Sequence, residues 1–66
     1  MPYLNLKAEM ARRDVLIEEI AHILGIHRNS VHFKLNKGNR FYVDEAITIH
    51  QTFFKDLEFA ELFRRE

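Results

Sequence analysis

The sequence predicts an all-α fold made of five short helices. Two observations support this prediction. The one Pro stands at position 2 and the two Gly stand at positions 25 and 38, so most of the chain has no residue that breaks a helix. Between and after these Pro and Gly residues, apolar residues recur three and four positions apart, which is the spacing of one helix face. A chain of 66 residues can bury a single small core, so we predict one domain over residues 1–66.

The first two predicted helices come before Gly25. One spans Leu4–Arg13 and ends near Asp14, a residue type that tolerates the left-handed backbone found at helix ends. The other spans Ile17–Leu24 and is stopped by Gly25, which adopts that backbone without strain. The residues predicted to face the core from these two helices are Leu6, Met10, Ala11, Ile20, Ala21 and Leu24.

Three more helices are predicted after Gly25. One spans Arg28–Leu35, with Gly38 as its left-handed cap, and one spans Val43–Phe53. Asp56 is expected to cap a short fifth helix, because Asp is a preferred N-cap residue. The residues predicted to face the core from these helices are Val31, Leu35, Val43, Ala46, Ile47, His50 or Phe53, Leu57, Ala60 and Phe63.

The composition excludes several classes of protein. The chain has no Cys, so it has neither a disulfide framework nor a thiolate metal site, which fits a reducing compartment. No apolar run approaches the roughly 18 residues of a membrane span. The first residues also lack the basic and then apolar pattern of a signal peptide. We therefore expect a cytoplasmic protein with no membrane partner.

Charge is distributed unevenly along the chain. Ten basic and ten acidic residues cancel, which taken alone argues against a nucleic-acid partner. No Asp or Glu occurs from Ile20 to Val43, however, and this acid-free segment carries +4, against −1 for residues 1–19 and −3 for residues 44–66. Its basic and imidazole side chains belong to His22, His27, Arg28, His32, Lys34, Lys37 and Arg40. The segment favours an anionic partner, although a chance cluster on a solvated face would look the same.

Residues 17–36 have the layout of a helix-turn-helix. Gly25 permits a tight turn between two short helices, and the apolar Ile26 seals that turn against the core. Ala21 is small at the point where the second helix must cross closely. Val31 packs the second helix back onto the first. The pattern therefore predicts two helices that cross steeply around Gly25.

A known family shares this pattern. The string at residues 18–36, EEIAHILGIHRNSVHFKLN, resembles the helix-turn-helix of the Cro and phage-repressor type, also called XRE-like. That family's pattern has two acids, Leu-Ala, Leu-Gly-Val-Ser, two polar residues, Thr-Val and a closing Leu-Asn-Gly. The resemblance extends to the first helix and to Val43–Phe54, so it covers nearly the whole chain. It implies a compact five-helix fold of the lambda-repressor/Cro type, in which the helix after the turn enters the DNA major groove.

Carried over by position, the resemblance assigns DNA base contacts to Arg28, Asn29, His32 and Phe33. Arg28 could donate two hydrogen bonds to guanine, Asn29 could pair with adenine, and Phe33 could meet a thymine methyl group. An alternative for Phe33 is packing under the loop at Phe41–Tyr42. The expected DNA phosphate contacts are His27, Ser30, Lys34, Asn36, Lys37 and Arg40.

The chain departs from the family pattern at three positions. Leu16 stands where a Ser or Thr would cap the helix before the turn, so that cap is missing. Ile17 replaces a polar residue that reaches a phosphate in relatives. His27 replaces the usual Ser or Thr cap of the helix after the turn, and its ring could instead contact a phosphate. The replacement at Ile17 therefore removes one expected contact with the DNA backbone, whereas the ring of His27 could add one.

The remaining candidate sites concern partners and chemistry. The C-terminal residues Phe54, Phe59, Leu62 and Phe63 are expected to form a homodimer interface, with a fully packed core as the alternative. His22, His27 and His32 are five residues apart and no Cys accompanies them, so we expect no metal site. No nucleophile–base pair or Gly-rich phosphate loop occurs, so we expect no enzyme activity, no cofactor and no small-molecule ligand.

The sequence thus leads to two functional hypotheses. The first is a sequence-specific regulator of transcription, a phage- or prophage-type repressor that binds double-stranded DNA in the major groove as a homodimer. The second is a protein-interaction module on the same fold, an antitoxin-like or antirepressor-type binder. The acid-free segment favours the first hypothesis, whereas the zero net charge and Ile17 favour the second.

Overall fold

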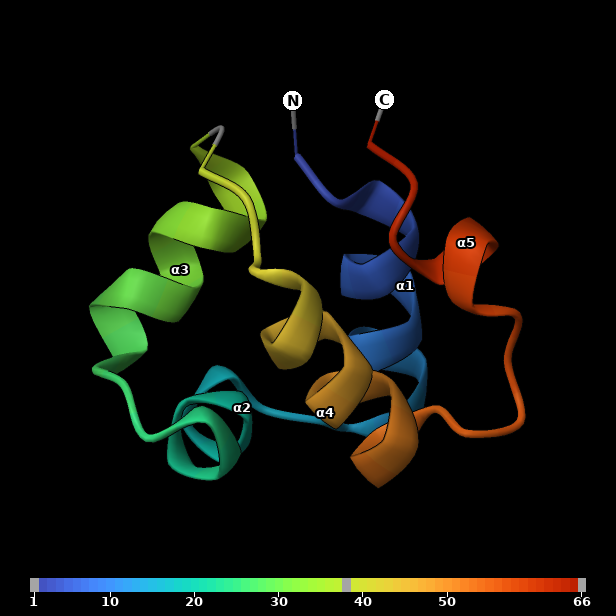
Figure 1. The fold of residues 1–66 in the computed structure, drawn as a ribbon, viewed down its shortest axis with the longest axis horizontal. Coiled ribbons are helices and arrows are strands. Elements are labelled where there is room, and N and C mark those ends of the chain that lie inside the picture. The colour runs from blue at the N-terminus through green and yellow to red at the C-terminus, as the bar shows by residue number, and fades with distance from the viewer. Residues whose placement is uncertain (1, 38, 66) are drawn as a thin grey trace.

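The computed structural model describes residues 2–37 and 39–65, and all regular secondary structure in them is helical. The helices are α1 (Leu4–Arg13), α2 (Ile17–Leu24), α3 (Arg28–Asn36), α4 (Val43–Phe53) and α5 (Phe59–Leu62) (Figure 1). The predicted all-α fold with five helices is confirmed. Helix α3 runs one residue further than predicted, and the expected cap at Gly38 lies outside the described residues.

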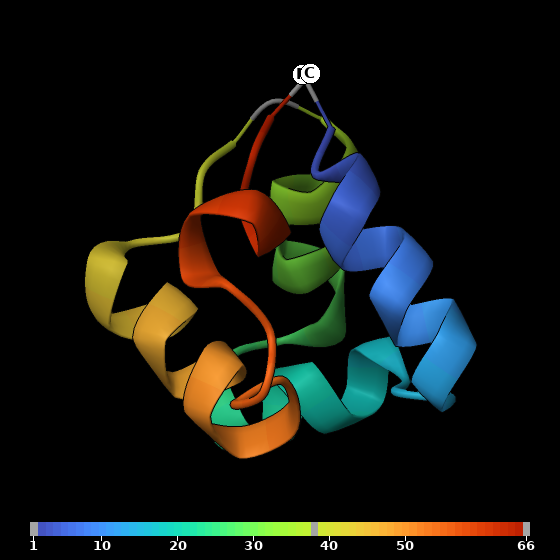
Figure 2. The same cartoon turned by 90° about the vertical axis from the view of Figure 1, so that its right-hand side faces the viewer.

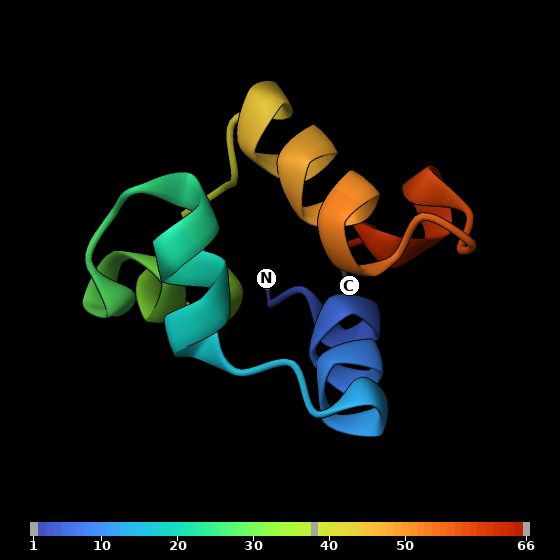
Figure 3. The same cartoon turned by 90° about the horizontal axis from the view of Figure 1, so that it is seen from below.

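The helices surround a single core. Helix α2 packs against α3 and α4, and α1 packs against α5. In Figure 1 α2 is seen nearly end-on while α3 runs up the picture, so the two helices cross steeply, as the sequence predicts. Figures 2 and 3 show α5 beside α1 on the side of the molecule away from α3. In the described part of the chain, no helix has the length and apolar character that a membrane crossing requires.

The core is apolar throughout the described residues. No polar or charged residue is buried there. The buried side chains belong to Tyr3, Leu6, Met10, Ile20, Ala21, Val31, Leu35, Phe41, Ala46, Ile49, Phe54 and Leu62. Most of the predicted core positions of the first three helices are therefore confirmed, with Ala11 exposed and Leu24 half-buried as exceptions.

The predicted inner face of α4 is wrong in part. Ala46 and Ile49 are buried, whereas Val43 and Ile47 are 74% and 41% exposed. Both Val43–Ala46–Ile47 and Ala46–Ile49–Phe53 satisfy helical spacing, and Ala46 belongs to both faces. Packing of α4 on α2 selects the second face, so Val43 and Ile47 remain on the surface.

The predicted cap of α5 is also wrong. The helix begins at Phe59, and the carboxylate of Glu58 accepts a hydrogen bond of 2.8 Å from the backbone N–H of Glu61. Leu57 and Phe63 are half-buried against the core, as predicted, whereas Ala60 is exposed and Leu62 is the buried residue of α5. The carboxylate of Asp56 instead accepts a hydrogen bond from Arg13, so it does not cap α5.

Tyr3 joins the N-terminal segment to three other parts of the chain. Its backbone N–H donates to the carbonyl of Leu35 at the end of α3 (3.1 Å), and its hydroxyl accepts from the backbone N–H of Phe41 (3.2 Å). The ring packs edge-on against Phe63, at 6.2 Å between centroids, and lies under the guanidinium of Arg65. These contacts hold the segment before α1 beside the segment after α5 (Figures 1 and 2).

Asp56 is paired with Arg13, which ties α1 to the segment after α4. The guanidinium of Arg13 donates to both carboxylate oxygens of Asp56, at 2.8 and 2.7 Å, and to the carbonyl of Phe53 at 3.0 Å. The Arg13 group also lies over the ring of Phe54. The hydrogen bonds from Arg13 lower the pKa of Asp56 from 3.8 to about 2.

This pair predicts a specific loss of stability in acid. A carboxyl with a lowered pKa in the folded state stabilises the fold above its unfolded pKa, and that contribution is lost as the pH falls from about 4 to about 2. Asp56→Asn should therefore give a shallower fall of Tm over this pH range than the parent chain shows. Thermal denaturation followed by circular dichroism measures this slope. Asp44→Asn, which makes the same change of charge at an exposed position on α4, is the control; equal slopes for the parent and Asp56→Asn would contradict the prediction.

Candidate nucleic-acid interface

The turn between α2 and α3 has the geometry that the sequence predicts. Gly25 has φ 68° and ψ 32°, in the left-handed region. Its N–H donates to the carbonyl of His22 (3.3 Å), and the N–H of Ile26 donates to the carbonyl of Ala21 (3.1 Å). This pair of bonds is a Schellman motif, which satisfies the last carbonyls of α2. The turn therefore fixes the direction in which α3 leaves α2.

His27 caps the start of α3. Its Nδ1 accepts a hydrogen bond of 3.0 Å from the backbone N–H of Asn29. A ring nitrogen that accepts this bond carries no proton, so a ring protonated at Nδ1 could not hold the cap. If His27 contacted a phosphate as an imidazolium, with a proton on Nδ1, helix α3 would therefore lose this cap.

Helix α3 has one buried face and one exposed face. Val31 and Leu35 are buried, and the four predicted base-contact residues are exposed on other sides of the helix. Phe33 is 51% exposed. The loop residue Phe41 packs instead on Tyr3 and Phe63, so the alternative that Phe33 packs under this loop is wrong.

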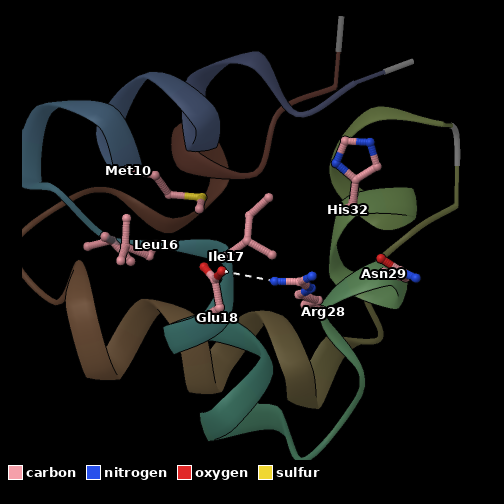
Figure 4. Close-up of a pocket in the computed structure, with 8 residues that line it drawn as sticks. Met10, Leu16, Ile17, Glu18, Arg28, Asn29 and His32 are labelled. Atoms are coloured by element: carbon pink, nitrogen blue, oxygen red, sulfur yellow. Dashed lines mark hydrogen bonds and ion pairs between the residues drawn. The ribbon is translucent and has the colours of Figure 1, made fainter.

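A groove of about 610 Å³ runs between α3 and the start of α2 (Figure 4). Arg28, Asn29 and His32 line it from α3, and Ile17 and Glu18 line it from α2. The other lining residues are Met10, Val15 and Leu16. The structure therefore brings three of the four predicted base-contact residues together with the first turn of α2, while Phe33 is not in the groove lining.

Glu18 is a site residue that sequence reasoning missed. Its Oε2 accepts a hydrogen bond from Nη1 of Arg28 at 3.4 Å, and Figure 4 shows the two side chains pointing toward each other. Both side chains are largely exposed, at 61% and 65%. In the sequence Glu18 stands ten residues before Arg28, in a helix start where acids are common, so no pattern pointed to the pair.

Apart from His27, the predicted phosphate contacts fall into two groups. Lys34 is half-buried and held by three contacts: its ammonium lies 3.4 Å from the carboxylate of Glu45, donates to the carbonyl of Arg40, and sits 4.5 Å from the ring centroid of Tyr42. Only 13% of the Lys34 side chain is exposed. Asn36 is also engaged, because it accepts from the ammonium of Lys7 and donates to the carbonyl of His32.

The second group remains at the surface. Ser30, Lys37 and Arg40 are exposed. The side chains of Lys37 and Arg40 form no ion pair with the residues that the structure describes. Of the four cations in the acid-free segment, Arg28 and Lys34 are therefore paired with acids from outside it. Lys37 and Arg40 form no such pair with the described residues.

The start of α2 confirms the missing cap. Leu16 has no side-chain acceptor, and its exposed fraction is 58%. The carboxylate of Glu19 accepts the backbone N–H of Leu16 at 2.8 Å, which supplies half of a capping box. Together with Ile17, this arrangement leaves an apolar edge where a polar residue would meet a phosphate in the resembled family.

The expected dimer interface needs a correction. Phe54 is fully buried and Leu62 is 3% exposed, so both belong to the core and neither can contact a partner. Phe59 is 37% exposed, and its ring lies 5.0 Å from that of the half-buried Phe63. The predicted interface therefore reduces to Phe59 and Phe63. The five helices share one core, and the side chains of Phe54 and Leu62 fill part of it.

Comparisons with protein-family models, curated proteins and solved structures found no match for this chain. Among the described residues, no three His, Cys, Asp or Glu side chains are grouped as a metal site requires. What this chain can bind is therefore inferred from the geometry around α3.

Gly25 should be sensitive to substitution for a conformational reason alone. A Cβ built at Gly25 meets no atom within 4 Å, yet the residue has a positive φ. Gly25→Ala should therefore destabilise the fold by about 1 kcal/mol, through the left-handed backbone and without a clash. Gly25→Asn should be milder, since Asn tolerates this region better. Urea denaturation measures both variants, and an Ala variant as stable as the parent would show that the turn is not held in this conformation.

The His27 cap gives a second stability prediction. His27→Ala leaves the N–H of Asn29 without its acceptor, so the variant should lose about 1 kcal/mol of stability. His27→Ser keeps an acceptor at the cap and should be at least as stable as the parent. Urea denaturation of the three chains tests this ranking. If His27→Ala and His27→Ser lose the same stability, the ring contributes in some way other than capping.

Proposed function

We propose that this protein is a sequence-specific double-stranded DNA-binding regulator of transcription, of the Cro and phage-repressor type. The observation that carries the proposal is the placement of Arg28, Asn29, His32 and Phe33 on exposed sides of a helix that follows a left-handed turn at Gly25. An α-helix fits the major groove, and these side chains can read base edges and thymine methyl groups.

The two ends of α3 have different roles in the proposed complex. Arg28 and Asn29 stand in its first turn and line the groove of Figure 4, and their side chains carry guanidinium and amide donors. Lys37 and Arg40 follow its last turn, where their cations would meet the phosphates that flank the bases. Lys34 supports this arrangement from inside, since its contacts to Glu45 and to the carbonyl of Arg40 hold the loop after α3.

We further propose that the protein acts as a homodimer on two half-sites and represses by covering a promoter. Of the four predicted interface residues, Phe59 and Phe63 remain at least partly exposed after folding. A symmetric pair would place two α3 helices in successive major grooves, about 34 Å apart.

A second candidate function is a protein-interaction module on the same fold. The observation that favours it is the start of α2, where exposed Leu16 and the carboxylate of Glu18 occupy the place that a phosphate would approach. An apolar edge beside a carboxylate suits a protein partner better than a DNA backbone.

Salt dependence of binding separates the two functions. With Lys37 and Arg40 free in each protomer, a dimer would neutralise about four phosphates, so log K should fall against log salt with a slope of about −3.5. Binding is measured by fluorescence anisotropy on duplexes that the protein selects from a random pool. A slope near zero, or no binding at low salt, would favour the interaction module.

Two substitutions within the same measurement test the division into base and phosphate contacts. Arg28→Ala should weaken binding to the selected duplex by about 1–3 kcal/mol for each half-site and change binding to a scrambled duplex little. Lys37→Ala should weaken binding to both duplexes alike and reduce the salt slope. The division is wrong if the two variants behave in the same way on both duplexes.

A further inference from the structure

Among the described residues that line the groove beside α3, Glu18 is the one with a carboxylate. It stands in the first turn of α2, opposite Arg28 in the first turn of α3. Its other neighbours in the groove are the apolar Ile17 and Leu16 and the polar Asn29 and His32. A negative charge at this point is unexpected if the groove only attracts the DNA backbone, because it repels phosphates.

The contact between the two side chains leaves most of the guanidinium available. Nη1 of Arg28 donates to Oε2 of Glu18 at 3.4 Å, and Figure 4 shows this bond across the groove. An Arg side chain has five N–H donors in a rigid plane, so one bond to Glu18 still permits a bidentate contact with another group. Because the two residues stand on different helices, the turn at Gly25 sets the position of one relative to the other.

We propose that Glu18 is a positioning residue that determines sequence specificity: it orients Arg28 toward base edges and keeps phosphates away from its guanidinium. The inference deepens the proposed DNA-binding function and rests on it. An Arg without such a neighbour can bind any phosphate, which contributes affinity but no sequence information. With Glu18 beside it, Arg28 gains most from a guanine edge, whose two acceptors match its free donors.

The pair has little effect on folding and a larger effect in the complex. Both side chains are more than half exposed in the free protein, and exposed ion pairs contribute little to stability. When a DNA duplex covers the groove, water leaves and the attraction between the two charges strengthens. Removing the carboxylate should therefore change DNA recognition without changing the stability of the fold.

The test compares Glu18→Gln with a matched control, Glu61→Gln. Glu61 is 60% exposed, forms an ion pair with Arg64 and loses the same charge, but it lies on α5. Kd is measured for a duplex selected by the parent from a random pool and for a scrambled duplex of equal composition. Glu18→Gln should lower the ratio of the two affinities about tenfold, with tighter binding to the scrambled duplex, whereas Glu61→Gln should keep the ratio of the parent.

Two further measurements show whether Glu18 acts through Arg28. In the Arg28→Ala background, Glu18→Gln should no longer change the affinity ratio, because there is no guanidinium left to orient. The Tm of Glu18→Gln should equal that of the parent. A change of ratio that persists without Arg28, or an equal change in Glu61→Gln, would overturn the inference.

The outcomes also separate this inference from the function on which it rests. If the parent binds no duplex at low salt, the proposed function and the role of Glu18 fail together. If the parent distinguishes the selected from the scrambled duplex and Glu18→Gln does so equally well, DNA binding stands and the role of Glu18 alone is wrong.

Discussion

The left-handed backbone at Gly25 is the constraint on which the rest of the candidate site depends. It ends α2, and the N–H groups of Gly25 and Ile26 satisfy the carbonyls that α2 leaves open. The chain then reverses closely enough for Val31 and Leu35 to reach the core. Because a helix with one buried face must expose the other, this single turn decides which side chains of α3 are available to a partner.

The far end of α3 is held by different means. The N–H of Tyr3 bonds to the carbonyl of Leu35, and the hydroxyl of Tyr3 accepts from the N–H of Phe41, so the first residues of the chain fix both α3 and the loop after it. Lys34 adds a third support through Glu45 on α4. A helix anchored at both ends presents its exposed side chains in one orientation, which sequence-specific recognition requires.

The sequence could predict those parts of the fold that local rules decide. Gly25 adopts the left-handed backbone that ends a helix without the strain that a Cβ would add, and the bounds of α1, α2 and α4 follow from apolar spacing and such signals. The inner face of α4 and the cap of α5 were mispredicted for a common reason. Two faces of α4 and two acids before α5 satisfy the local rules equally well, and contacts with distant residues select between them, as Arg13 does when it pairs with Asp56.

The same limit applies to the candidate site and changes what its charge means. In linear order the segment from Ile20 to Val43 has four cations and no acid, but folding brings Glu18 to Arg28 and Glu45 to Lys34. In the proposed complex, attraction to a phosphate backbone would therefore be weaker than the composition of the segment indicates. A DNA-binding protein with few free cations must gain much of its affinity from base edges, and that affinity is present only on the correct sequence. In the proposed function, weak binding to the DNA backbone would then be an advantage, because DNA of the wrong sequence would bind less of the protein.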